Sequence, residues 1–163
     1  MKRVNVVKVI ALITMVWTAS VAWADDNAIR GNAEVAQSKQ LVGAWSLTQI
    51  PEEGGPPPFA MLMVFNRDGG VVETDAGPPN PLQFSPGIGE WKHTNSGYVV
   101  NYTQLQYDDG QNHIGIFKGH LEITVDDEKG TLTGTVRVRF LDTNETLLFE
   151  GFGTVEGKRI PFE

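Results

Sequence analysis

Residues 113–142 decide the fold, because apolar and polar side chains alternate along them on both sides of a short turn. The stretch reads HIGIFKGHLEITVDDEKGTLTGTVRVRFLD. The apolar positions of its first half are Phe117, Leu121, Ile123 and Val125, and those of its second half are Leu132, Val136, Val138 and Phe140. A period of two is typical of a β-strand with one buried and one wetter face. Lys129-Gly130 between the halves is turn chemistry, so the stretch predicts an antiparallel hairpin.

The same alternation extends to the rest of the chain after residue 40. We expect eight strands, over residues 42–50, 59–66, 70–75, 88–94, 97–108, 113–126, 131–142 and 145–158. Their connections contain Gly, Asn and Asp, which tolerate the positive φ angles of hairpin turns. The pattern predicts an all-β fold, a single eight-stranded antiparallel up-and-down barrel over residues 41–163. A flat two-layer sandwich is the alternative architecture for the same strands.

Prolines divide the expected barrel into two unlike ends. Eight of the nine prolines fall between Pro51 and Pro86, in the connections after the first and third strands. Because connections in a meander alternate between ends, both proline-rich loops lie at one end, and the tight turns at 66–70, 95–97 and 127–130 lie at the other. Stiff loops at one end and a pinched opposite end predict a cup; the alternative is that the prolines only lower the entropy of loops.

The first 24 residues are typical of a cleaved signal peptide. Lys2, Arg3 and Lys8 precede an apolar run over 9–17, and the run leads to an A-x-A cleavage site at 22–24. The apolar run is too short for the roughly 20 residues of a membrane span, so we expect no membrane insertion after cleavage. We expect a periplasmic or secreted protein whose residues 25–40 form an N-terminal arm or short helix.

Charge and composition exclude several classes of function. Loss of the three basic residues of the leader takes the formal net charge of the 163-residue chain from −7 to −10. Nucleic-acid binding needs a basic surface, so nucleic acid is not an expected partner. The chain has no cysteine, which excludes disulfides and thiol nucleophiles. No histidine pair has metal-ligand spacing and no Gly-rich phosphate loop is present, so we expect neither metal nor cofactor.

Strand 97–108 is the most unusual run, because either face carries polar groups among apolar ones. One face would present Asn101 and Thr103, and the other Tyr102 and Gln104. The alternation leaves open which face points inward. Apolar cavities with a few hydrogen-bonding groups are typical of small-molecule sites, although such groups also satisfy one another or bound water.

Two segments at opposite ends of the strand succession resemble lipocalins and the wider calycin superfamily. Leu41-Val42-Gly43-Ala44-Trp45 resembles the G-x-W opening of their first strand, and Arg159 resembles their closing basic residue. The 115 or so residues between resemble small bacterial lipocalin-like proteins in their scattered Gly, Trp and Thr positions. The resemblance implies structural closure by Gly43, Trp45 and Arg159, with the guanidinium packed across the indole. It also implies a cup that holds a small apolar ligand.

The sequence is compatible with three functions. The first is binding of a small hydrophobic molecule. Its candidate residues are Met61, Met63, Phe65, Asn101, Tyr102, Thr103, His113 and Phe117. The second is a cofactor-free isomerase or cyclase resembling the allene oxide cyclase barrels. Its catalytic candidates are Tyr102, His113 and Glu150. The third is a periplasmic protein-binding module such as a protease inhibitor, with the arm at 25–40 entering its target. For His113 the alternative is a loop position beside Asp108 and Asp109.

Overall fold

A computed structural model describes residues 40–75 and 83–161 of the chain. Within them the strands are β1 (Gly43–Pro51), β2 (Phe59–Phe65), β3 (Gly70–Asp75), β4 (Gln83–Phe84), β5 (Gly87–Thr94), β6 (Gly97–Tyr107), β7 (His113–Asp126), β8 (Thr131–Asp142) and β9 (Leu147–Arg159). The expected leader at 1–24 and all of the arm at 25–40 except Gln40 lie outside the described residues. No helix among the described residues is long and apolar enough to cross a membrane.

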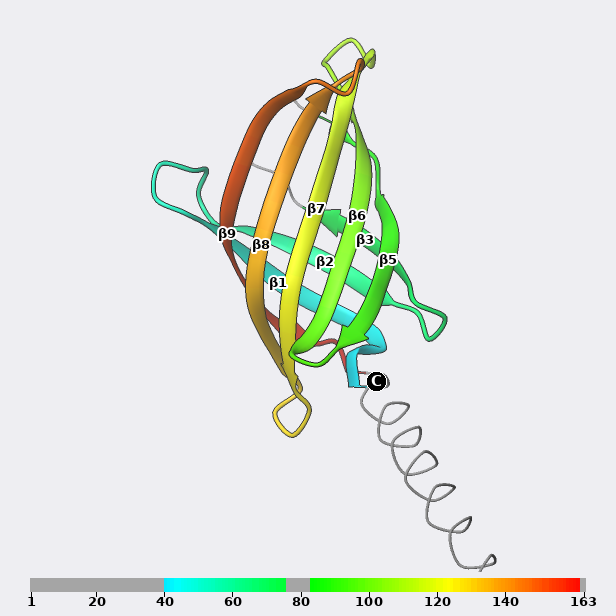
Figure 1. Cartoon of the computed structure of the whole chain (residues 1–163), viewed down its shortest axis with the longest axis vertical. Coiled ribbons are helices and arrows are strands. Elements are labelled where there is room, and N and C mark those ends of the chain that lie inside the picture. Colours follow the sequence, from blue (N-terminus) through cyan, green and yellow to red (C-terminus); the bar gives the residue numbers. More distant parts are fainter. Residues whose placement is uncertain (1–39, 76–82, 162–163) are drawn as a thin grey trace, which may run out of the picture. The chain divides into compact units, whose positions relative to one another are not determined.

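The strands close into a single antiparallel barrel (Figure 1). Neighbours along the chain pair with each other from β1 to β3 and from β5 to β9. The pairing of β3 with β5 and of β9 with β1 completes the ring. The eight-stranded up-and-down barrel predicted from the alternation is therefore confirmed, and the two-layer sandwich is wrong. Closure leaves the eight wall strands with no free edge along most of their length.

The short strand β4 is the one element that the sequence pattern did not predict. Gln83 and Phe84 pair with Tyr107 and Gln106, whereas β5 pairs with residues 97–103 of β6. β4 and β5 therefore lie one after the other along the same edge of β6, and together they fill one position in the wall. Pro86 lies between them, where a residue without an N–H cannot continue a ladder.

The inner face of the barrel holds the core, and alternation places the apolar residues there. Trp45, Leu47, Met61, Met63, Phe65, Val100, Leu121, Leu132 and Val155 are each at most 1% exposed. The residues between them on the same strands point outward. On β6 the face that carries Tyr102 and Gln104 points into the barrel, because both side chains are buried while Asn101 and Thr103 are exposed.

Tyr102 takes its place in the core because the strand beside it carries a glycine. Gly119 on β7 pairs directly with Tyr102, and a Cβ at Gly119 would lie 2.2 Å from the tyrosine ring. The aromatic ring therefore occupies the volume that a side chain at Gly119 would need.

Gly119→Ala is expected to lower the free energy of unfolding by about 1–3 kcal/mol, because the added methyl group forces Tyr102 out of its position. Urea denaturation measures the loss. Gly70→Ala is the control, since its added Cβ would stand 3.5 Å from its nearest neighbours, at ordinary contact distance. Equal stability of Gly119→Ala and Gly70→Ala would contradict the packing described for Tyr102.

Candidate functional site

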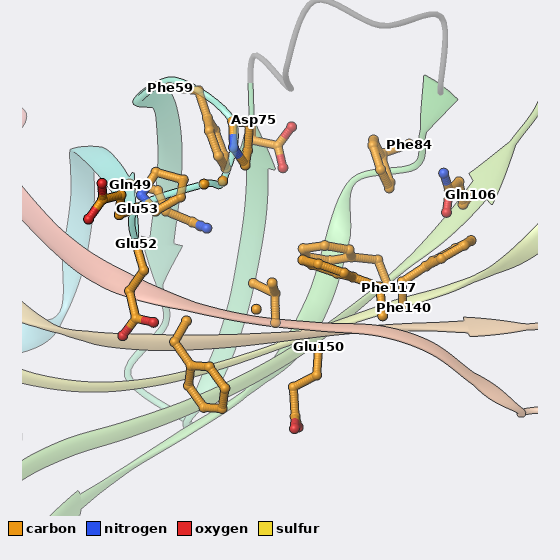
Figure 2. Close-up of a pocket in the computed structure, with 18 residues that line it drawn as sticks. Gln49, Glu52, Glu53, Phe59, Asp75, Phe84, Gln106, Phe117, Phe140 and Glu150 are labelled. Atoms are coloured by element: carbon orange, nitrogen blue, oxygen red, sulfur yellow. The ribbon is translucent and has the colours of Figure 1, made fainter.

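A cavity of about 540 Å³ lies at the end of the barrel where the first proline-rich loop connects β1 to β2. Its walls are aromatic: Phe59, Phe84, Phe117, Phe140, Phe149 and Phe152 all line it. In Figure 2, Gln49, Phe59 and Asp75 lie on one side and Phe84 and Gln106 on the other, with Phe117 and Phe140 below Phe84 and Gln106 in the view. The volume is within the range of small-molecule sites, roughly 300–1,000 Å³.

The cavity owes its opening to the unequal lengths of β1 and β9. Their pairing stops at Pro51 and Gly153, although β9 begins six residues earlier at Leu147. The proline-rich loop turns away there, held by a hydrogen bond from the Glu52 N–H to the Phe152 carbonyl. Four consecutive residues, 149–152, line the cavity, and consecutive residues of a strand point to opposite faces. The cavity is therefore open beside β9 as well as at the mouth.

Two buried glutamines place polar atoms in this aromatic lining. Gln49 is 4% exposed and Gln106 is 3% exposed, and both line the cavity. The Oε1 atom of each has no hydrogen-bond partner among the described residues. Burial of an unpaired amide oxygen costs about 1–3 kcal/mol, which a ligand that donates a hydrogen bond would remove.

A second polar group lies deeper on the inner face, where Glu73 is fully buried. Its carboxyl meets Tyr102 and Gln104 over a glycine: a Cβ at Gly87 would lie 2.6 Å from Glu73 Oε2 and 2.8 Å from Tyr102 Cδ2. Neither carboxyl oxygen has a hydrogen-bond partner among the described residues. Burial, with a smaller contribution from the Asp75 charge, raises the pKa of Glu73 from 4.5 to about 8. Glu73 is therefore mostly protonated at neutral pH.

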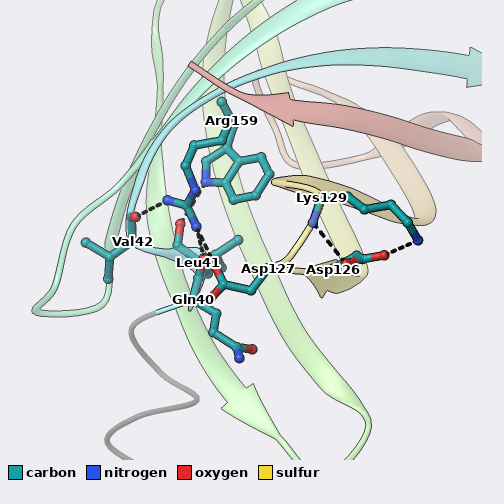
Figure 3. Close-up of polar contacts among 8 residues, drawn as sticks. Gln40, Leu41, Val42, Asp126, Asp127, Lys129 and Arg159 are labelled. Carbon is teal, nitrogen blue, oxygen red and sulfur yellow. Dashed lines mark hydrogen bonds and ion pairs between the residues drawn. The ribbon is translucent and has the colours of Figure 1, made fainter. Parts of the chain in front are cut away.

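The end of the barrel opposite the cavity is plugged by Trp45 and Arg159. Trp45 is fully buried, its Nε1–H donates to the Leu41 carbonyl at 2.8 Å, and the Arg159 guanidinium carbon lies 4.5 Å from the indole centroid. Arg159 also donates to the carbonyls of Gln40 and Val42 and lies 3.5 Å from the Asp127 carboxylate (Figure 3). A single side chain thus joins the last strand, the entry to β1 and the β7–β8 turn.

Gly43 allows this plug to form. It adopts φ = +130°, a backbone conformation that favours glycine, and a Cβ there would lie 3.0 Å from the Arg159 Nη1 atom. The three residues that the resemblance singled out for closure therefore lie together at one end of the barrel.

The ligand-binding candidates other than His113 fall into three groups. Phe117 lines the cavity. Met61, Met63, Phe65 and Tyr102 are buried in the core and do not belong to the described cavity lining. Asn101 and Thr103 are exposed on the outer face of β6, so the structure places them outside the barrel lumen.

The catalytic candidates do not come together. The Glu150 carboxylate is on the outer side of β9, 3.1 Å from the Nε atom of Arg139, and points away from Phe117 and Phe140 in Figure 2. His113 is exposed and lies beside the Tyr107 ring. The β6–β7 register shifts between Gln106 and Tyr107, so the alternation that places Phe117 inside does not extend to His113.

Acidic residues in two of the turns, Asp108 and Asp126, have structural partners. Asp108 accepts hydrogen bonds from Asn112, and Asp126 pairs with Lys129 at 2.6 Å. Within the described part of the chain no group of three or more His, Asp or Glu residues is placed to hold a metal ion.

The sequence interpretation missed Gln49 and Glu73, although the signal for both was present. Gln49 has the same parity as Trp45 and Leu47, and Glu73 the same parity as Val71. The alternation rule places both side chains inside. Comparisons with family models, curated proteins and solved structures find no match to this chain.

Proposed function

We propose that this protein is an exported lipocalin-like barrel that binds a small apolar molecule in the cavity at its open end. The observation that carries the proposal is the cavity itself: six phenylalanines surround about 540 Å³ at one end of the barrel, and Trp45 and Arg159 plug the other end. Burial of apolar ligand surface in such a site contributes about 25 cal/mol per Å². The signal-like residues 1–24 support export, and the G-x-W opening supports the lipocalin-like assignment.

Filling the cavity tests the proposal. Val138 lines the cavity and is 8% exposed, so Val138→Trp adds bulk where the ligand would lie. We expect this variant to bind Nile red, a neutral apolar fluorescent probe, at least tenfold more weakly than the wild-type protein, a loss of about 1.4 kcal/mol. Fluorescence titration measures the affinity.

Val72→Trp is the matched control. Val72 is 43% exposed on the outer face of β3, so the same substitution there adds the same bulk outside the lumen. Thermal unfolding of both variants shows that each is folded. Two outcomes would refute the proposed site. Either Nile red binds Val138→Trp as tightly as the wild-type protein, or it does not bind the wild-type protein at all.

A further inference from the structure

The charged side chains that line the cavity are all acidic in the described part of the chain. They are Glu52 and Glu53 of the proline-rich loop, Asp75 at the end of β3, and Glu150 of β9. The Glu150 carboxylate pairs with Arg139 on the outer side, and the lining also carries the carboxylates of Glu52, Glu53 and Asp75. The lining contains no Lys, Arg or His that would bind an anionic headgroup. A fatty acid would therefore bring a carboxylate into a field of its own sign.

The buried polar atoms of the cavity also favour a hydrogen-bond donor such as a protonated amine. Gln49 and Gln106 each present an Oε1 atom without a hydrogen-bond partner among the described residues, and both side chains are more than nine-tenths buried. Amide oxygens accept hydrogen bonds, whereas an ammonium group only donates them. This observation is independent of the acidic rim, since it concerns neutral side chains inside the cavity.

The aromatic walls suit a cation as well as an apolar body. Phenylalanine rings attract a cation over their faces, by about 0.5–2 kcal/mol depending on desolvation. Phe59, Phe84, Phe117 and Phe140 line the same cavity as Asp75, and in Figure 2 Phe117 and Phe140 lie below Phe84. Rings, carboxylates and amide oxygens are together the groups that recognise a basic nitrogen attached to an apolar chain.

We propose that the ligand of this cavity is an apolar cation, a molecule with an alkyl or aromatic body and a protonated amine. The inference rests on the proposed function and names its ligand class. The apolar body lies among the phenylalanines, and the cationic group lies near Glu52, Glu53 and Asp75 and the Oε1 atom of Gln49, on one side of the cavity.

Three probes of equal chain length test the ligand class: decylammonium, decanol and decanoate, each below its micelle concentration. Isothermal titration of the full mature protein at low salt is expected to give the tightest binding for decylammonium, with decanoate at least tenfold weaker. The preference for the cation is expected to shrink in about 0.5 M salt, because screening weakens exposed carboxylates most.

The variant Glu52→Gln/Glu53→Gln/Asp75→Asn removes the three carboxylates and keeps side-chain size. We expect it to bind decylammonium about tenfold more weakly and decanol within about twofold of wild type. The control Glu90→Gln/Glu128→Gln/Glu156→Gln removes the same charge from exposed positions outside the cavity lining, and its affinity for both probes is expected to remain at the wild-type level.

The outcomes separate this inference from the function on which it rests. If decanol and decanoate bind as tightly as the cation, the ligand class is wrong while apolar binding stands. If both triple variants lose cation affinity equally, the effect is one of net charge and the proposed site for the cation is wrong. If neither Nile red nor any decyl probe binds, the proposed function itself fails.

Discussion

Trp45→Ala is expected to destabilise the barrel by about 3–5 kcal/mol, the loss typical of a fully buried tryptophan. Trp45 is 0% exposed, and its indole makes contact with the Arg159 guanidinium and a hydrogen bond to the Leu41 carbonyl. Its removal leaves a void at the plugged end and takes away the surface on which Arg159 packs. Total stabilities of small domains are about 5–15 kcal/mol, so a large part of the stability is at risk. Urea denaturation followed by circular dichroism measures the change.

A substitution at Arg159 separates two contributions to stability at the plugged end of the barrel, that of the positive charge and that of the hydrogen-bonding geometry. Arg159→Lys keeps the positive charge but loses the planar group that reaches the carbonyls of Gln40 and Val42 together. We expect it to lose about 1.5–3 kcal/mol of stability, the range for hydrogen bonds to charged groups. Lys158→Ala, one residue earlier with an exposed side chain, is the control and is expected to change stability by less than about 0.5 kcal/mol. Equal losses at Arg159 and Lys158 would show that the plug adds nothing to the stability.

The strand pattern predicts the barrel well because its cause is local. A closed sheet has one inner and one outer face, so every strand must alternate, and the alternation is visible in residues such as Leu121 and Ile123 without knowledge of the partners. The turns are equally local: Asp142 accepts hydrogen bonds from the N–H groups of Asn144 and Thr146 within one short segment. These features required no knowledge of long-range register.

The cavity could not be predicted in this way, because it depends on how far distant strands overlap. Pairing of β1 with β9 ends at Pro51 and Gly153, over a hundred residues apart in sequence, and this end point opens the wall beside Phe152. The register shift near Tyr107 likewise breaks the alternation along β7, so that His113 does not share the inner face with Phe117. Rich apolar runs such as 61–65 predict core and cavity equally, and the structure places Met61 and Met63 in the core.

Glu73 is expected to make the protein less stable as the pH rises through neutrality. The folded chain holds the proton of this buried carboxyl up to about pH 8, whereas an unfolded chain releases it near its ordinary pKa of 4.5. Below 4.5 both states are protonated, and the barrel has its full stability. Between the two pKa values the unfolded state binds fewer protons, so the free energy of unfolding falls, by at most about 1.4 kcal/mol per pH unit. Urea denaturation at about pH 5 and about pH 8.5 is expected to differ by several kcal/mol.

Glu73→Gln isolates the effect of this one carboxyl. The variant keeps the shape of the side chain but carries no charge at any pH, so it is expected to match wild type near pH 5 and to be more stable near pH 8.5. The groups that face Glu73 are Asp75 on its own strand and Tyr102 on β6, and both remain in the variant. Burial raises the pKa of Tyr102 well above 10, so Tyr102 does not titrate in this window.

Glu90→Gln, which removes an exposed carboxyl from the outer face of β5, is expected to keep the pH dependence of wild type. A constant difference in stability between wild type and Glu73→Gln across this pH range would mean that Glu73 titrates in the folded barrel as it does in water, and hence that the carboxyl is hydrated and not enclosed among Tyr102, Gln104 and Gly87.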